Sequence, residues 1–306
     1  MIPSDIVDTG DDGGDNRSIG GCLRKMVIEP GEGEGSPARY SLRFGDRLIP
    51  LDPLIGKRIR LEFGGTIRCV ACNRATRKSF NQGYCYPCFR SLAACDLCIV
   101  RPETCHYHEG TCREPEWAMS HCMQPHIVYL AATSTIKVGI TRKTQMPTRW
   151  LDQGAMQAMP LFEVPTRRDA GLVEAALKAH ISDRTDWRAM LKGGAEPVDL
   201  AAAARDLLER AQGSLENLLL VESQAAADGR RRAKDIAEML HPLAPAADEF
   251  SYPLDRPPPS LRSISLDKTP LIEDILVGSK GQYLVFESGV FNVRKHGGYE
   301  ISLGIL

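Results

Sequence analysis

The sequence predicts a mixed α+β protein in which a cysteine-rich segment separates two β-rich regions. Three observations carry this prediction. Short strands are indicated in residues 21–68 and 261–306, nine of the ten cysteines fall within residues 69–122, and strand signals alternate with helical periodicity in residues 126–197. At 306 residues, of which 43% are hydrophobic, the chain has the composition of a globular protein with about two domains.

Charge and hydropathy exclude several classes of protein. The 38 Lys and Arg residues balance 39 Asp and Glu residues, so a net charge of -1 provides no overall attraction to nucleic acid. No run approaches the ~18 apolar residues of a membrane-spanning helix, and aspartates occupy the first twenty residues, where a signal peptide needs basic and apolar residues. We therefore expect a cytoplasmic protein with no membrane partner.

The N-terminal part of the chain divides at about residue 20. Residues 1–20 are rich in Gly and Asp and predict a disordered tail. Residues 21–68 predict short strands separated by Gly and Pro. The clearest strand signal is at residues 58–63, where charged and apolar residues alternate strictly.

Residues 69–125 are the expected zinc-binding module. Two CxxC pairs, with twelve residues between them, are formed by Cys69, Cys72, Cys85 and Cys88. Each CxxC turn delivers two thiolates, so the pairs predict one closed tetrahedral zinc site. In a reducing compartment we favour metal ligation over disulfides. The alternative is two reduced cysteine pairs buried in a β-rich core.

The remaining cysteines of the module predict a second zinc. We expect a closed site formed by Cys98, Cys105, Cys112 and Cys122. Cys95 or His108 is the alternative ligand at one of these positions. A catalytic zinc would keep a position for water, which the abundance of thiolates disfavours.

Residues 126–197 predict the order strand, strand, helix, strand, helix. HIVYLAA, TIKVGIT and LFEV have strand character, PTRWLDQ predicts a helix that ends at Gly154, and residues 169–181 predict an amphipathic helix. Residues 198–241 predict two further helices, and residues 242–260 predict an extended Pro-rich linker. Three strands are expected in residues 261–306, and we expect them to pair with residues 21–68.

A local cationic patch accompanies the predicted hairpin. All charged residues between residues 133 and 151 are basic, namely Lys137, Arg142, Lys143 and Arg149. Such a patch beside a helical carboxylate, Glu174, suits phosphodiester chemistry, because cations hold a phosphate and a carboxylate can place a divalent metal. The four basic residues are therefore the predicted nucleic-acid-binding residues.

Part of the sequence resembles the core of the GIY-YIG endonuclease superfamily. The resemblance is carried by Val128-Tyr129-Leu130, the segment KVGIT at residues 137–141, Arg149 and Glu174. The resemblance implies a small three-stranded antiparallel sheet with helices. It also implies catalytic positions, which are Tyr129, Lys137, Arg149 and Glu174. By this resemblance Tyr129 assists a water nucleophile, Arg149 stabilises the pentavalent phosphate, and Glu174 anchors one Mg²⁺. Lys137 occupies the position of the second Tyr of the superfamily.

The region from about residue 21 to residue 306 also resembles an uncharacterised prokaryotic family of Cys-rich proteins, a domain of unknown function. RCVAC, GYCYPC, CDLCIVRPETCH and KGQYLVFESGVFNVRK carry this likeness, which implies no activity. The favoured hypothesis is a zinc-containing protein that binds DNA or RNA through a nuclease-like core without efficient cleavage. A Mg²⁺-dependent endonuclease is the alternative, and a structural or protein-interaction protein is the second alternative.

Overall fold

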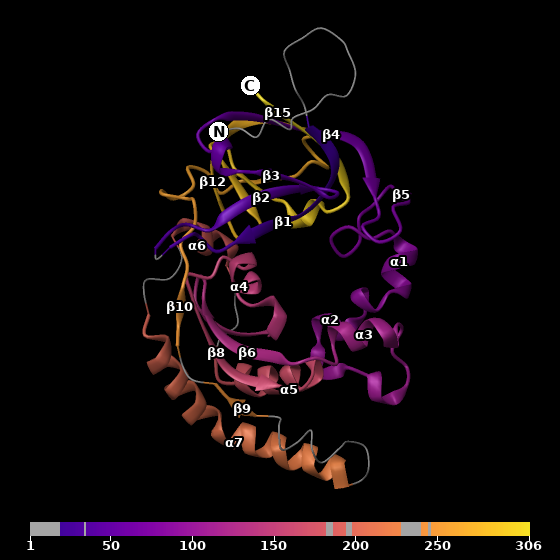
Figure 1. Ribbon diagram of the computed structural model, residues 1–306, viewed down its shortest axis with the longest axis vertical. Helices are drawn as coiled ribbons and strands as arrows, with labels where there is room; N and C mark the ends of the chain where they lie inside the picture. The colour runs from indigo at the N-terminus through magenta and orange to yellow at the C-terminus, as the bar shows by residue number, and fades with distance from the viewer. Residues whose placement is uncertain (1–18, 34, 182–185, 194–197, 228–239, 244–245) are drawn as a thin grey trace. The chain divides into compact units, whose positions relative to one another are not determined.

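The computed structural model describes residues 19–33, 35–181, 186–193, 198–227, 240–243 and 246–306, which form two compact units (Figure 1). Among the described residues, the first unit comprises those in 19–29, 39–85 and 252–306, and the second comprises those in 30–38 and 86–251. Most of the expected disordered tail, residues 1–18, lies outside the described residues. Ile19 and Gly20 already belong to a strand.

The first unit is built on a sheet with ten described strands. Its strands are β1 (Ile19–Glu29), β2 (Arg39–Phe44), β3 (Arg47–Pro50), β4 (Arg58–Arg68), β5 (Ala75–Thr76), β11 (Ser263–Ile264), β12 (Leu271–Lys280), β13 (Tyr283–Phe286), β14 (Val290–Asn292) and β15 (Tyr299–Ile305). Short 3-10 helices, η1 (Asp52–Leu54) and η6 (Arg294–His296), connect some of them. Alternation explains β4, since Ile59 and Leu61 are buried while Arg58 and Glu62 are exposed.

Strands from the two terminal parts of the first unit lie side by side. The order is β11-β14-β13-β12-β4-β15-β1-β2-β3, with β5 paired to β4. Leu303 of β15 pairs with Ile19 of β1 on one side and Leu61 of β4 on the other, both antiparallel. In Figure 1 the indigo ribbons of the early strands and the yellow ribbons of the late strands belong to this one sheet, with β15 placed between β4 and β1.

The second unit contains a sheet with five described strands. These are β6 (His126–Ala132), β7 (Ile136–Arg142), β8 (Gln157–Val164), β9 (His241–Pro242) and β10 (Asp248–Glu249). β6 lies between β7 and β8, and both pairs are antiparallel. β9 and β10 each pair with β8. β10 lies within residues 242–260, the range expected to be an extended linker, and β9 begins one residue before that range.

The second unit has two groups of helices. One group, in residues 86–121, forms its Cys-rich part, and the other group, from residue 143 onward, accompanies the five-stranded sheet. They are α1 (Tyr86–Ser91), η2 (Ala93–Cys95), α2 (Leu97–Val100), η3 (Pro102–Thr104), η4 (Tyr107–Glu109), α3 (Pro115–His121), η5 (Lys143–Gln145), α4 (Thr148–Asp152), α5 (Arg167–Lys178), α6 (Trp187–Lys192) and α7 (Leu200–Ala227). Of the two helices expected in residues 198–241, the first is α7, and residues 228–239 lie outside the described part.

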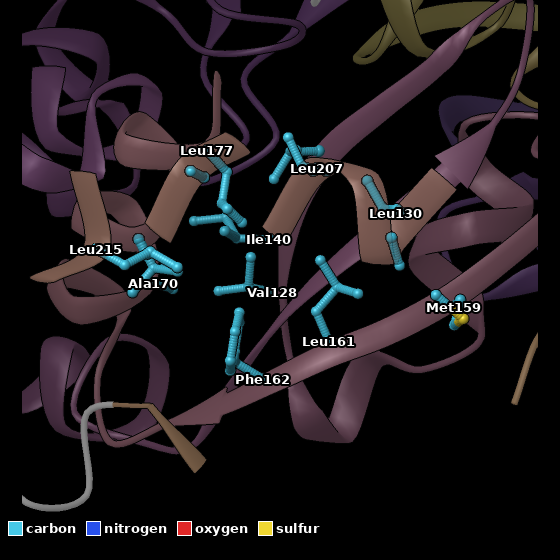
Figure 2. Packing of buried hydrophobic residues seen from close by; sticks show 14 of the residues in the cluster. Val128, Leu130, Ile140, Met159, Leu161, Phe162, Ala170, Leu177, Leu207 and Leu215 are labelled. Atoms are coloured by element: carbon cyan, nitrogen blue, oxygen red, sulfur yellow. The ribbon is translucent and has the colours of Figure 1, made fainter. Parts of the chain in front are cut away.

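The five-stranded sheet has two different faces. Val128, Leu130 and Ala132 pack on one face in a core with residues of α5 and α7 (Figure 2). Leu207 and Leu215 belong to an apolar stripe of α7, which faces this core. The second face carries a smaller cluster, formed by Ile127, Tyr129, Ala131, Trp150, Ala155 and Ala158.

Among the described residues, none of the helices combines the length and the apolar character needed to cross a bilayer.

Candidate functional site

The two CxxC pairs meet in one cluster, as the sequence predicts. The sulfur atoms of Cys69, Cys72, Cys85 and Cys88 all lie within 4.8 Å of one another, and the Cys72 and Cys85 sulfurs are 3.7 Å apart. Zn–S bonds of about 2.3 Å place the sulfurs of a tetrahedral zinc about 3.8 Å apart. The cluster therefore fits a metal ion such as zinc.

Local backbone turns produce this geometry. The backbone N–H of Asn73 donates to the carbonyl of Cys69, and Asn73 adopts a positive φ of 57°, which Asn tolerates better than most residues. In the second turn Gly83 has a φ of 132°, and a Cβ there would lie 2.4 Å from a methyl carbon of Val70. Gly83 thus lets the two cysteine turns approach closely.

The cluster also favours a thiolate. Burial of Cys69 opposes ionisation, but backbone N–H groups of Cys72 and Cys85 donate to its sulfur and lower its pKa to about 6. Zinc binds the deprotonated thiol, so this sulfur is prepared for a metal near neutral pH. Four protein ligands leave no position for water, which indicates a structural rather than a catalytic metal.

The second cysteine group is arranged differently. Ligand atoms of Asp96, Cys98 and His106 lie within 4.8 Å of one another. The Cys98 thiol donates to Cys105, which lowers the pKa of Cys105 to about 6, whereas burial raises the pKa of Cys122 to about 11. The predicted set of Cys98, Cys105, Cys112 and Cys122 stays a prediction at this point, as do its alternatives Cys95 and His108.

Tyr129 of β6 is fully buried and lies against β7. It pairs with Gly139, and a Cβ at Gly139 would come within 2.7 Å of the Tyr129 ring and hydroxyl. A side chain at residue 139 would displace the tyrosine. Gly139 is therefore needed here to make room for Tyr129.

Three elements contribute polar groups around the Tyr129 hydroxyl. It donates to Oε1 of Gln153 at 3.3 Å and also makes a side-chain hydrogen bond with Arg149 of α4. Burial raises the pKa of Tyr129, the Arg149 charge opposes this shift, and the carboxylate of Glu174 on α5 adds to it. The structure thus brings together Tyr129, Arg149 and Glu174, which are 45 residues apart in the sequence at their extremes.

The predicted cations have different environments. Lys137 pairs with Ala131 on the Tyr129 face of the sheet and is buried, with 9% of its surface exposed. Lys143 is exposed, and its ammonium group lies 2.8 Å from a carboxylate oxygen of Glu163. β8 therefore supplies Lys143 with an acidic partner from outside the basic segment 133–151.

Arg167 and His126 were not among the predicted site residues. Arg167, the first residue of α5, donates from Nη2 to the carbonyl of Ile99 at 2.7 Å; burial lowers its pKa, Cys122 raises it, and Arg149 lowers it further. His126 at the start of β6 is fully buried, and burial lowers its pKa to about 4. Its Nδ1 donates to the carbonyl of Gln124, while Nε2 has no partner among the described residues.

Residues 56–301 match the model of a family described as "Protein of unknown function (DUF2797)". The chain belongs to the DUF2797 family. The matched range of this DUF2797 protein includes both cysteine groups and the Tyr129 neighbourhood, whereas β1, β2 and β3 precede it. Neither a curated protein nor a solved structure matches the chain.

Proposed function

We propose that this DUF2797 protein is a zinc-stabilised nucleic-acid-binding protein that holds a phosphate near Tyr129 and Arg149. The observation that carries the proposal is the convergence of Tyr129, Arg149 and Glu174, from β6, α4 and α5, around one buried hydroxyl. A guanidinium group is suited to this role, since it can grip two phosphate oxygens at once.

The order of the elements supports the same proposal. β6 is central between β7 and β8, α4 follows β7, and α5 follows β8. This is the antiparallel arrangement that the GIY-YIG resemblance implies. Arg167 adds positive charge close to the same region, since the charges of Arg149 and Glu174 both act on it. Arg142 pairs with His126 and lies on the opposite face of the sheet.

Binding is favoured over cleavage by two features of the site. Lys137 supplies an ammonium group where the superfamily has a phenol. Glu174 is 14% exposed, and its carboxylate lies 3.2 Å from the ammonium group of Lys178, one turn along α5. A Mg²⁺ ion at Glu174 would have to compete with this ion pair. Mg²⁺-dependent endonuclease activity is therefore the second candidate function.

The binding experiment measures fluorescence anisotropy of labelled single-stranded, double-stranded and hairpin DNA and RNA. Titrations are performed at low and moderate salt for the native chain and for Arg149→Ala. We expect Arg149→Ala to weaken binding about 10- to 100-fold, from the roughly 1.5–3 kcal/mol of a charge-assisted hydrogen bond. It should also reduce the salt slope by about one.

Arg43→Ala is the matched control, because Arg43 is a surface cation of the first unit, paired with Asp46 at 3.4 Å. Its affinity should equal that of the native chain. Cleavage is assayed on the same substrates with Mg²⁺ and Mn²⁺, with Glu174→Gln as the test variant. Metal-dependent cutting lost in Glu174→Gln would establish the endonuclease, and no binding to any substrate at low salt would leave a structural or protein-interaction role.

A further inference from the structure

A second group of potential metal ligands lies in the Cys-rich part of the second unit. One ligand atom from each of Asp96, Cys98 and His106 lies within 4.8 Å of the other two. Nε2 of His106 is 3.6 Å from Oδ2 of Asp96. Bonds of about 2.0–2.2 Å from zinc to nitrogen and oxygen place two tetrahedral ligands roughly 3.4 Å apart. These two side chains are therefore spaced as ligands of one ion would be.

The start of α2 explains how the Asp96 carboxylate comes to face this group. Asp96 is the N-cap residue of α2, and Cys98 is the second residue of the helix. An Asp at an N-cap usually accepts a hydrogen bond from a backbone N–H of the first turn, but the Asp96 side chain makes no such bond. Its carboxylate lies instead beside His106 and Arg113.

A threonine fixes the position of the proton on the His106 ring. Nδ1 of His106 is 2.7 Å from the hydroxyl oxygen of Thr111, and this hydroxyl donates its hydrogen to the carbonyl of His106 at 3.3 Å. Since a hydroxyl has one hydrogen, the oxygen of Thr111 accepts from the Nδ1–H group. Histidines that ligate a metal are typically held by such a partner at their other nitrogen.

The neutral form of His106 therefore directs two lone pairs at each other, one on its Nε2 and one on Oδ2 of Asp96. Their separation of 3.6 Å is longer than an N–H···O hydrogen bond. A metal ion bound by both atoms removes the repulsion between them. A doubly protonated His106 paired with Asp96 is the alternative, and the metal analysis below distinguishes the two.

Arg113 holds the carboxylate and still leaves it able to bind an ion. Nε of Arg113 lies 2.7 Å from Oδ2 of Asp96, and its Nη1 donates to the carbonyl of Leu92 at 3.2 Å. A carboxylate has two oxygens with about four lone-pair sites, so Asp96 can accept from Arg113 and bind a metal at once. Carboxylates that ligate metals are commonly hydrogen-bonded in this way. Arg113 is thus a positioning residue.

Contacts with α5 fix the chain that carries the group. Nη2 of Arg167 donates to the carbonyl of Ile99, the residue after Cys98, at 2.7 Å. Between Cys98 and His106, Pro102 packs so closely on Gly171 that a Cβ at Gly171 would lie 2.5 Å from the Cβ of Pro102. These contacts do not depend on an ion, so the ligands are preorganised for one.

We propose that Asp96, Cys98 and His106 bind a zinc ion, separate from the ion of the Cys69 cluster. Imidazole and thiolate ligands favour zinc over Mg²⁺ or Ca²⁺. Three protein ligands leave the fourth tetrahedral position to water or another exchangeable ligand, whereas the four cysteines of the Cys69 cluster close their site. The proposed ligands share only Cys98 with the four-thiolate site expected from the sequence. The site does not depend on the proposed nucleic-acid binding.

Zinc content tests the ligand set. Each chain is incubated with zinc, and unbound ion is removed by gel filtration before metal analysis. We expect about two zinc ions in the native chain, and about one in Cys98→Ser and in His106→Ala. Cys112→Ser is the matched control and should retain two, because Cys112 belongs only to the four-thiolate alternative. One zinc in the native chain, two in His106→Ala, or one in Cys112→Ser would overturn the proposal.

X-ray absorption at the zinc edge covers the case in which variants fail to fold, because it needs only the native chain. Two zinc ions with the proposed ligands have five sulfur neighbours in all, four from the Cys69 cluster and one from Cys98. We therefore expect an average of about 2.5 sulfurs per zinc, with nitrogen and oxygen as the remaining ligands. An average of four sulfurs would overturn the proposal.

Thr111→Val tests how His106 is positioned. Removal of the partner of a ligating histidine typically weakens metal affinity about 10- to 100-fold. We expect such a loss for one of the two zinc ions, measured by competition with a chelator. Ser120→Ala is the matched control, since its hydroxyl lies 2.7 Å from Nδ1 of His121, a histidine outside the group. Unchanged affinity in Thr111→Val, or an equal loss in Ser120→Ala, would contradict the role of His106 as a ligand.

Discussion

The two faces of the five-stranded sheet use the same strand, β6, for different purposes. On one face Val128, Leu130 and Ala132 meet apolar residues of α5 and α7. On the other face Ile127, Tyr129 and Ala131 meet α4, and this side also contains a buried hydroxyl and the buried Lys137. The first face has the composition of a stabilising core, and the second combines packing with polar groups.

The difference teaches where stability and chemistry reside in this unit. Burial of a polar group without a full set of partners costs free energy. The Tyr129 face contains such a group, since the buried Nε1 of Trp150 has no hydrogen-bond partner among the described residues. Substitutions on the apolar face should therefore change stability alone, while those on the Tyr129 face should change stability less and ligand binding more.

The largest expected effect is on the apolar face. Leu207 of α7 is fully buried in the core, so Leu207→Ala should lower the free energy of unfolding by about 3 kcal/mol through lost burial and a cavity. Urea denaturation followed by circular dichroism measures this change. Leu220→Ala on the same helix is the control, because Leu220 is 67% exposed and should cost less than about 0.5 kcal/mol. Equal losses of stability in Leu207→Ala and Leu220→Ala would contradict the role of this face as a stabilising core.

His126 is the polar exception on the apolar face, since alternation in β6 places it with Val128. Its pKa of about 4 lies below the ordinary value of 6.5, so between pH 6.5 and 4 the unfolded chain binds a proton that the folded chain does not. Stability should fall as pH decreases through this window, by roughly 3 kcal/mol at its lower end.

Denaturation at pH 7 and pH 4.5 for the native chain and His126→Gln measures the contribution of this histidine. The variant should lose less stability than the native chain over the same interval, since carboxylates affect both chains alike. An identical loss in the two chains would show that His126 is protonated while the protein is folded.

Gly139→Ala should destabilise the Tyr129 face by about 1–3 kcal/mol, because the added Cβ would collide with the tyrosine ring. The cost should shrink in a Tyr129→Leu background, which removes the ring, and thermal unfolding of the four chains measures the coupling. Gly213→Ala in α7 is the control; its Cβ would meet nothing within 4 Å, so it should stabilise the protein by up to about 1 kcal/mol.

Tyr129→Phe should cost about 1 kcal/mol, since it removes only the hydroxyl that binds Gln153 and Arg149. If the proposed phosphate site is correct, the same variant should weaken nucleic-acid binding more than Leu207→Ala does at temperatures where both are folded. Anisotropy titrations make this comparison. Stronger loss in Leu207→Ala would mean that stability, not the Tyr129 face, controls binding.

The smallest expected effect is at Lys143, whose ion pair with Glu163 is solvent-exposed. Lys143→Ala should change the free energy of unfolding by less than about 1 kcal/mol. It should also weaken nucleic-acid binding less than Arg149→Ala, because Glu163 already compensates its charge. A larger loss of affinity in Lys143→Ala than in Arg149→Ala would indicate that the interface lies at the end of β7 near Lys143.

The sequence predicts features that depend on local spacing. The two CxxC turns, the alternation at residues 58–63 and the hairpin of β6 and β7 all follow from neighbours a few residues apart. β12 was not predicted, because Glu273 and Asp274 interrupt its apolar pattern. Asp274 is tolerated in a buried position since it accepts hydrogen bonds from backbone N–H groups of Ile275 and the distant Ser288.

In the candidate sites, too, the sequence predicts little that depends on contacts between distant residues. Tyr129, Arg149 and Glu174 were proposed from a resemblance, but the sequence did not reveal that Gly139 makes room for the tyrosine or that Glu163 pairs with Lys143. Arg167 was also missed as an anchor, because its partners Ile99 and Cys122 are 68 and 45 residues earlier. Contacts of this length depend on tertiary packing, which local patterns do not report.

The place of β15 in the ten-stranded sheet has a consequence for the synthesis of the chain. β15 separates β1 from β4, so a ribosome releases both neighbours long before residues 299–305, which must lie between them, are translated. Until then β1 and β4 each expose an unpaired edge, which is a template for association with other chains. Folding of this sheet is therefore expected to be late and slow, and a nascent chain that stalls before Tyr299 should be a substrate for chaperones.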